Sequence, residues 1–542
     1  MLRRVCLAVL LLGMPLLADV TLEQIRSKPP SNARNFLIWQ YFDQNITSEQ
    51  ADEAFYLIRD VNYKMFYAYA AKSARPEVAY TVGCLKMGSA ALGRTSDPAC
   101  AKLAASIGKL AYMPRADRDR IAELVGDPEL RYAGELLDDA NLSKDYRRYA
   151  PKLFLRVFNG VGSEARRLHF NFIPDYDYLQ RLAESPGFSA AVMRAISDDG
   201  LQRFAWALTK VEAGTLDAGT LFYLGLNQLI RGKTSRAVEF FQRSRDKAYY
   251  QSDKDRALFW QALAGGNDLM WEALAKSWDI NFYSLYAKEM TGAFPDNFYS
   301  QLQTTAKVSD INLSDPFVWN SLLEQIKQTP NAELYALAQR YDAKNLVALQ
   351  SFIVERASGY RLQGFIMPYE KELGSADADT KAIVYALMRQ ESRFIPAALS
   401  HSFAMGLMQI MPFLCVAMDD DVDCGRQSFD DMFAPRINLR YALPHVAWLQ
   451  QRVYHPLFIA YAYNGGIGFT KRHLLDGTFR PGKYEPFLSM ELMQNVETRE
   501  YGKKVLTNYV IYKKILGEPV SLIDLCRTLL RPSKTDRFRS AK

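Results

Sequence analysis

The 542-residue chain is poor in the side chains that build metal centres, with six cysteines and five histidines. No two cysteines are spaced as CxxC, and the histidines lie singly along the sequence. Because zinc sites need three or four such ligands close together, the sequence predicts no metal site. We expect no cofactor either.

The chain also lacks a strong excess of one charge. Its net charge is +7, and removal of Arg3 and Arg4 with an N-terminal segment that we expect to be cleaved leaves +5. These charges are spread along the sequence, which argues against a nucleic-acid partner. A mild positive excess suits loose attraction to an acidic polymer or an anionic surface.

Long apolar runs are absent after the first residues. The only such run, Val5 to Leu17, follows two arginines and precedes Ala18, a small residue suited to a cleavage site. It is shorter than the ~20 residues of a membrane-spanning helix. Residues 1–18 are therefore predicted to be a signal peptide that is removed on export; a retained anchor is the alternative.

The cysteines suggest an oxidising compartment. Once Cys6 has left with the signal peptide, the spacing predicts two short-range disulfides, and the second is the stronger prediction. These pairs are Cys84 with Cys100 and Cys415 with Cys424, while Cys526 has no neighbour in sequence. Buried free thiols are the alternative.

Two-residue alternation is scarce, and helix signals run from about Leu22 onward, so the predicted fold is all-α. Thr47 and Gln50 form a capping box at the start of one helix. Residues 221–244 and 252–278 each indicate a pair of helices, and repeated pairs imply a stacked α-solenoid over residues 19–299. The "GKTS" at residues 232–235 is interpreted as a turn, because Asn227 occupies the position where a phosphate-binding loop needs glycine.

Polar residues and prolines interrupt the pattern between Phe294 and Pro316. We expect a small helical linker domain at residues 300–362 and a compact C-terminal domain at 363–542, whose first helix starts within residues 374–381. The charged tail from residue 531 is expected to be solvated and disordered.

A carboxylate interrupts the apolar stripe of this helix. Ile383, Val384, Leu387 and Met388 recur at helical spacing, and the next position of the stripe is Glu391. One interpretation is a surface side chain, or one that pairs with a neighbouring arginine at position 389 or 393. We favour another: the helix is expected to stop before Pro396, so that the carboxylate faces a cleft with apolar walls. Desolvation would then raise its pKa, which suits a general acid at neutral pH.

Five motifs in order resemble the soluble lytic transglycosylases, which are bacterial cell-wall enzymes with a goose-type-lysozyme-like domain. They are Glu391-Ser392, Ser400, "GLMQIMP" at 406–412, "AYNGG" at 462–466 and "ETREY" at 497–501. We expect "GLMQIMP" to begin a second short helix that ends at Pro412. The match covers roughly residues 363–515, and the upstream helix pairs are similar to the solenoid and linker domains of this family.

The resemblance implies cleavage of the β-1,4 bond between N-acetylmuramic acid and N-acetylglucosamine in peptidoglycan without water. Glu391 would act as both general acid and general base, and the C6 hydroxyl of the sugar would close a 1,6-anhydro ring. One carboxylate suffices because the nucleophile belongs to the substrate, whereas ordinary glycosidases use two. It also implies a periplasmic protein whose partner is the peptidoglycan glycan strand. Peripheral association with the envelope and cell-wall synthesis or remodelling proteins are further candidates.

The resemblance assigns substrate-binding roles to seven residues: Ser400, Gln409, Met411, Tyr463, Asn464, Glu497 and Tyr501. Ser400 would contact the acetamido group, and Gln409 and Met411 would line the cleft. Tyr463 is expected to hydrogen-bond the carboxyl of Glu391. Two alternatives stay open: Asn464 contacts substrate or caps the following Gly-Gly turn, and Glu497 lies in the cleft or pairs with a nearby cation such as Arg499.

Two features depart from the family pattern. Phe403 stands where the family commonly has glycine, which would reshape the loop or narrow a subsite. The stretch "MDDDVDC" between Cys415 and Cys424 is expected to be an acidic loop, although its acids could supply a second carboxylate or bind Ca²⁺. The alternatives for function are a hydrolytic muramidase, which uses Asp419 to Asp423 or Glu497 to activate water, and a non-catalytic scaffold that binds the wall.

Overall fold

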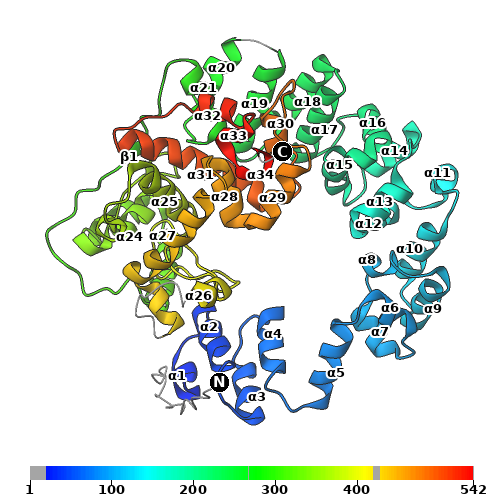
Figure 1. Cartoon of the computed structure of the whole chain (residues 1–542), viewed down its shortest axis with the longest axis horizontal. Helices are drawn as coiled ribbons and strands as arrows, with labels where there is room; N and C mark the ends of the chain where they lie inside the picture. The colour runs from blue at the N-terminus through cyan, green and yellow to red at the C-terminus, as the bar shows by residue number, and fades with distance from the viewer. Residues whose placement is uncertain (1–19, 266–267, 419–427, 541–542) are drawn as a thin grey trace, which may run out of the picture.

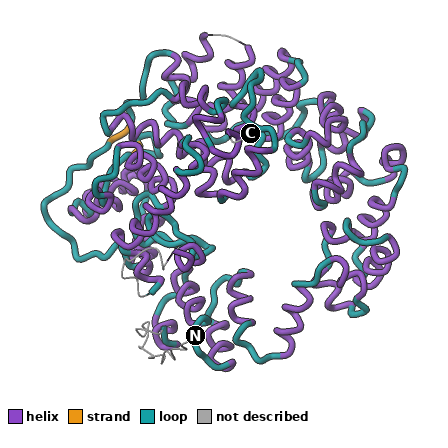
Figure 2. Tube along the Cα trace, in the orientation of Figure 1, coloured by secondary structure: helices purple, strands orange, loops and turns teal. Residues whose placement is uncertain are grey.

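The structure, a computed structural model, describes residues 20–265, 268–418 and 428–540. The described part consists of α-helices and short 3-10 turns with a single pair of two-residue strands, which confirms the all-α prediction. Figure 1 shows the helices from α1 to α21 following a curved path, with the C-terminal helices gathered on one side. The same view as a tube shows a ring-shaped chain with both termini on it (Figure 2). The predicted signal peptide lies outside the described residues.

The first half of the curved path contains the helices α1 Leu22–Ser27, α2 Asn32–Tyr41, α3 Ser48–Tyr56, α4 Tyr63–Ala70, α5 Pro76–Leu85, α6 Ser89–Arg94, α7 Pro98–Ala104, α8 Ile107–Leu110, α9 Arg115–Val125, α10 Pro128–Asp138 and α11 Leu142–Asp145. The second half contains α12 Pro151–Gly160, α13 Ser163–Phe170, α14 Tyr176–Ala183, α15 Phe188–Ile196, α16 Gln202–Ala207, α17 Ala218–Ile230, α18 Thr234–Lys247, α19 Gln251–Gly265, α20 Asp268–Ala275 and α21 Phe282–Met290.

The segment that follows contains α22 Pro316–Gln328, α23 Leu334–Arg340, α24 Val347–Ala357 and the parallel strands β1 Phe298–Tyr299 and β2 Gln363–Gly364. The remaining helices are α25 Ala378–Glu391, α26 Pro412–Met418, α27 Pro435–Gln450, α28 Pro456–Gly465, α29 Ile467–Leu475, α30 Phe487–Glu491, α31 Val496–Ile515, α32 Leu522–Thr528, α33 Pro532–Thr535 and α34 Arg537–Ser540.

Local sequence signals place several of these helices correctly. Thr47 and Gln50 form the predicted reciprocal capping box of α3. The predicted hairpin is α17 and α18, and the turn between them reverses at Gly232, whose positive φ of 75° is accessible to glycine at little cost. The second predicted pair is α19 and α20. Helix pairs that share one buried face therefore build the curved part of the chain.

Residues 532–535 and 537–540 of the C-terminal tail form the helices α33 and α34, which contradicts the prediction of a disordered segment. Thr535 and Asp536 are fully buried. The backbone N–H of Tyr454 donates to the carbonyl of Thr535 (2.7 Å), and Nε of Arg539 donates to the carboxylate of Asp536 (2.9 Å). The charged side chains neutralise each other, so a charged sequence can pack against the domain.

The segment Gly406 to Pro412 is not the predicted short helix. Backbone N–H groups of Met405 and Ile410 each donate to the carbonyl of the other (3.0 Å), which closes a tight loop. Pro412 begins α26 instead of ending a helix. Proline fits the first turn of a helix because its missing N–H has no partner to lose there.

The cysteines follow the sequence prediction in part. Cys84 and Cys100 form a disulfide that joins α5 to α7. Cys415 is buried, but Cys424 and the acidic residues 419–423 lie outside the described residues, so the stronger predicted pair stays a prediction. Cys526 is a buried free thiol, and burial raises its pKa well above its usual value. Within the described ranges, no helix combines the length and the apolar composition needed to cross a membrane.

Candidate active site

Glu391 is the last residue of α25, and residues 382–389 of this helix are all buried. The chain leaves the helix at Ser392, after which Arg393 and Phe394 adopt left-handed backbone conformations with φ of 49° and 67°. The helix therefore ends five residues before Pro396, and the reversal of the chain, rather than the proline, ends it. This turn leaves the Glu391 side chain half-buried at the end of a rigid helix.

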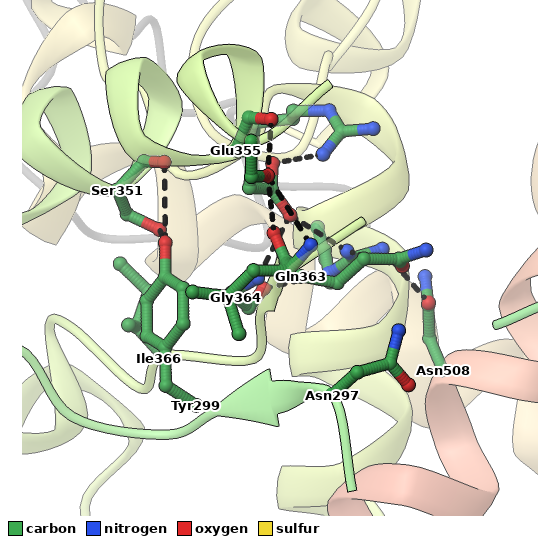
Figure 3. Close-up of polar contacts among 12 residues, drawn as sticks. Asn297, Tyr299, Ser351, Glu355, Gln363, Gly364, Ile366 and Asn508 are labelled. Atoms are coloured by element: carbon green, nitrogen blue, oxygen red, sulfur yellow. Dashed lines mark hydrogen bonds and ion pairs between the residues drawn. The ribbon is translucent and has the colours of Figure 1, made fainter. Parts of the chain in front are cut away.

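The two arginines beside Glu391 bind another acid. Arg389 donates to Oε1 of the buried Glu355 (2.9 Å), and Arg393 forms an ion pair with the same carboxylate. Figure 3 shows Glu355 and Gln363, a residue of β2, among these polar contacts, with Asn508 of α31 at the lower right. The interpretation in which Glu391 serves to pair with Arg389 or Arg393 is therefore wrong.

Tyr501 is the hydrogen-bond partner of Glu391. The Tyr501 hydroxyl, on α31, donates to Oε1 of Glu391 (2.6 Å). Burial raises the pKa of Tyr501 well above its usual value, so its hydroxyl stays protonated and able to donate. Desolvation raises the pKa of Glu391 to about 7; the Tyr501 hydrogen bond opposes this shift, and the charge of Glu497 adds to it. At neutral pH this carboxyl is present in both protonation states, as acid-base catalysis requires.

The "GLMQIMP" segment forms a loop that several polar contacts hold. Gly406 has a φ of 74°, and a Cβ at this position would collide with the carbonyl of Met432 and the side chain of Asn438. Gln409 donates from Nε2 to the carbonyls of Ala398 and Gly406 (both 2.9 Å). The amide of Gln409 thus fixes the loop, a role that the sequence did not predict.

Asn438 of α27 is a site residue that sequence reasoning missed. Its side chain is fully buried and donates to the carbonyls of Met405 and Met432 (both 2.9 Å). Its oxygen accepts from the backbone N–H of Met408 (2.9 Å). A lone asparagine within a helix carries no signal for this role, because its three partners lie 6 to 33 residues away.

Tyr463 of α28 reaches the same loop. Its hydroxyl donates to the carbonyl of Met408 (2.7 Å), so the expectation that it would hydrogen-bond Glu391 is wrong. The negative charge of Glu391 nevertheless contributes to raising the pKa of Tyr463, after the larger effect of burial. Tyr463 therefore lies near the carboxyl of Glu391. Met411, near the end of the "GLMQIMP" loop, is half-buried.

Ser400 lies in a second loop, residues 398–404, which we call the Ser400 loop. Its Oγ accepts a hydrogen bond from the backbone N–H of Ala404 (2.9 Å), and its own N–H donates to the Ala404 carbonyl (3.0 Å). Because the hydroxyl oxygen is used as an acceptor, its proton remains available to a ligand acceptor.

Asn464 and Glu497 contact each other. Nδ2 of Asn464 donates to Oε1 of Glu497 (3.1 Å), and Thr498 donates to the Asn464 side-chain oxygen (2.7 Å). Arg499 pairs with Glu500 (2.8 Å), so the alternative in which Glu497 binds Arg499 is wrong. Glu497 is exposed and sufficiently close to Glu391 to influence its pKa.

Most of the site lies in a segment that matches a known domain, whereas Glu497 and Tyr501 follow that segment. Residues 368–482 match the family model described as "Transglycosylase SLT domain", as the motifs predict. The soluble lytic murein transglycosylase of Escherichia coli (strain K12) is 25% identical over 213 residues, which are 38% of this chain and 32% of that protein. The matched segment thus spans about a third of the curated relative's length.

Two solved structures with a similar chain trace align with more of this chain than the sequence relative does. The X-ray structure of an inactive mutant of the lytic transglycosylase Slt from Pseudomonas aeruginosa covers 90% of this chain and 74% of that one, at 16% identity and a TM-score of 0.49. The crystal structure of the 70 kDa soluble lytic transglycosylase from Escherichia coli covers 95% and 86%, at 16% identity and a TM-score of 0.48.

Proposed function

We propose that the protein is an exported peptidoglycan lytic transglycosylase. It cleaves the bond between N-acetylmuramic acid and N-acetylglucosamine without water and leaves a 1,6-anhydromuramoyl end. The observation that carries this proposal is the carboxyl of Glu391, which ends a buried helix of a transglycosylase SLT domain, accepts a hydrogen bond from Tyr501 and has a pKa of about 7.

Glu391 acts first as the acid. Its protonated carboxyl donates to the glycosidic oxygen while the bond from C1 to that oxygen breaks and its electron pair leaves with the oxygen. Because Tyr501 holds Oε1, the exchangeable proton is carried by Oε2. In this arrangement Tyr501 contacts one oxygen of the carboxyl and the substrate contacts the other. The proton on Oε2 is therefore transferred in one direction, toward the substrate.

Glu391 then acts as the base. Its carboxylate takes the proton of the muramoyl C6 hydroxyl while that oxygen bonds to C1, which closes the anhydro ring and restores the protonated acid. The nucleophile is part of the bound sugar, so its effective concentration is high and no second carboxylate is required. The N-acetyl group of the substrate supports the cationic intermediate.

The other predicted residues divide into two groups in this proposal. Ser400 directs its hydroxyl proton to the acetamido group, and Met411 supplies an apolar wall. Gln409, Tyr463 and Asn464 use their polar groups within the protein, so they act by fixing the walls of the cleft. Glu497 and Tyr501 tune the charge of Glu391.

The proposal includes the division of the chain. Residues 19–299 form the solenoid, 300–362 the linker domain and 363–542 the catalytic domain, after a signal peptide at 1–18 directs export to the periplasm. The partner is the peptidoglycan glycan strand.

Digestion of purified sacculi with mass analysis of the fragments tests the proposal. Muramoyl products one water lighter than those of a hydrolase support it, and products that carry the water identify a muramidase. Glu391→Gln replaces the acidic carboxyl with an amide of nearly the same shape. It should therefore abolish the release of glycan fragments while binding to sacculi persists. Unchanged release by this variant would remove Glu391 from the mechanism, and binding without release by the wild-type protein would favour the scaffold alternative.

A further inference from the structure

The N-terminal helices hold the Ser400 loop by its backbone. Four consecutive carbonyls of the loop, those of residues 399–402, accept hydrogen bonds from side chains more than 330 positions earlier. Asn32 donates to the carbonyls of Leu399 (3.2 Å) and Ser400 (2.9 Å). Asn62 donates to that of residue 401 (3.4 Å), and Lys64 to that of residue 402 (3.2 Å).

Phe403 fixes the same loop through its ring. It is fully buried, although its backbone is left-handed with a φ of 65°, a conformation that is unfavourable for a bulky side chain. Its ring packs against Phe36 (centroids 5.4 Å apart) and Trp39 (5.7 Å) of α2. The ammonium of Lys64 lies 4.6 Å from the Trp39 centroid and 5.0 Å from that of Phe403. Aromatic burial and the cation-π contacts offset the cost of the backbone conformation.

The contact continues toward the other loop of the site. Trp39 packs on Phe429 (5.4 Å) and Phe36 on Phe433 (6.0 Å), at the two ends of the 3-10 turn Phe429–Phe433. The carbonyl of Met432 in this turn is one of the acceptors of Asn438, which holds the "GLMQIMP" loop. Helix α2 therefore supports both loops on which the sugar-binding residues lie.

We propose that α2 and α4 complete the sugar-binding site: Asn32, Trp39 and Lys64 are positioning residues that hold the Ser400 loop where it binds the substrate. This role rests on the proposed function. Glu391 lies on α25 and is held by α31, so detachment of the N-terminal helices displaces the Ser400 loop and leaves the acid in place. The loss should appear in the binding of the sugar and not in the titration of the acid.

Substitution of Trp39 in the full-length protein tests this role. Trp39→Ala should lower kcat/KM on soluble glycan strands by about 10- to 100-fold, mainly through KM, because misplacement of a binding group by about 1 Å has an effect of that size. The pH at which activity falls because Glu391 ionises should not change. Trp39→Phe, which keeps a ring, should recover most of the loss. Trp206→Ala removes an exposed tryptophan of α16 and is the matched control, expected to behave as the wild type.

Hydrogen exchange measures the structural half of the role without any activity. In Trp39→Ala the amides of residues 398–404 should exchange faster, while those of α25 keep their protection. Asn32→Ala, a smaller change, should give the same pattern and covers the case in which Trp39→Ala fails to fold. Unchanged exchange and unchanged KM in Asn32→Ala would overturn the positioning role. If the wild-type protein releases no anhydro product, the proposed function fails, whatever the exchange result.

Discussion

The Tyr501 hydroxyl donates to Oε1 of Glu391 at 2.6 Å and so connects the end of α25 to α31, 110 residues later in the sequence. This hydrogen bond favours the ionised carboxyl, whereas the surrounding burial favours the neutral form. The opposition of these two effects places the pKa of Glu391 at about 7. The proposed function, in which Glu391 serves as acid and then as base, depends on this balance.

Tyr501→Phe should therefore raise the pKa of Glu391 further, because the variant loses a hydrogen bond to the ionised form. In the pH dependence of kcat, the fall of activity at high pH should move to higher pH. The rate at the optimum should drop by about tenfold, since the carboxyl also loses its orientation. Tyr509→Phe is the matched control: it removes a hydroxyl from the same helix that donates to Asp379. An unshifted profile in Tyr501→Phe would show that this contact does not tune the acid.

Glu391→Gln should stabilise the folded protein at high pH. The folded-state pKa of Glu391 is raised from 4.5 to about 7, so the stability that its neutral form contributes is present below about 4.5 and is lost as the pH rises through about 7. Glutamine does not ionise and escapes this loss. Urea unfolding should find the two proteins similar at about pH 4.5 and the variant more stable by about 3 kcal/mol at about pH 8. A difference that does not depend on pH would contradict the raised pKa.

Glu355→Gln should destabilise the protein by about 3 kcal/mol, because it leaves the buried guanidinium of Arg389 without its counter-charge. Thermal unfolding measures the change. Glu324→Gln removes an acid of similar chemistry from an exposed pair with Lys327 and should change stability by about 0.5 kcal/mol or less. Equal effects of the two substitutions would contradict a supporting role of Glu355 beneath α25.

Asn438→Ala should weaken both stability and catalysis. The variant leaves the carbonyls of Met405 and Met432 and the N–H of Met408 without their buried partner, at a cost of about 2 kcal/mol. Release of anhydro products should fall at temperatures where the variant is still folded, because the loop shifts. Asn345→Ala, which removes exposed hydrogen bonds to Ser309, serves as the control for losing an asparagine. Full activity of folded Asn438→Ala would place the loop outside the site.

The sequence predicts what depends on neighbouring residues. The capping box at Thr47, the turn at Gly232 and the start of α25 within residues 374–381 each follow from a few consecutive side chains and their helical spacing. Glu391 is visible because a carboxylate replaces an apolar residue in a regular stripe. Its raised pKa follows from that position, since burial is what the stripe predicts.

The features that the sequence did not predict depend on contacts between distant segments. Two tyrosines, at 463 and 501, are equally suited to hydrogen-bond Glu391, and only the packing of α31 on α25 selects Tyr501. Proline permits both a helix end and a helix start, so Pro412 is ambiguous without the loop that precedes it. The charged tail is held to the domain by hydrogen bonds to distant segments, such as the one from the N–H of Tyr454 to the carbonyl of Thr535, and no local pattern identifies these partners. Phe403 is conspicuous in the sequence, but its partners on α2 are more than 360 positions away.

The attachment of α2 and α4 to residues 399–402 also bears on when the proposed enzyme becomes active during its synthesis. A nascent or prematurely terminated product that stops between the Ser400 loop and Tyr501 contains α2 and this loop but lacks the side chain that holds Glu391. Under the proposed function, the lytic activity therefore stays low until synthesis has passed α31. Protease cleavage that removes the first seventy residues would also lower this activity, because α2 and α4 are lost.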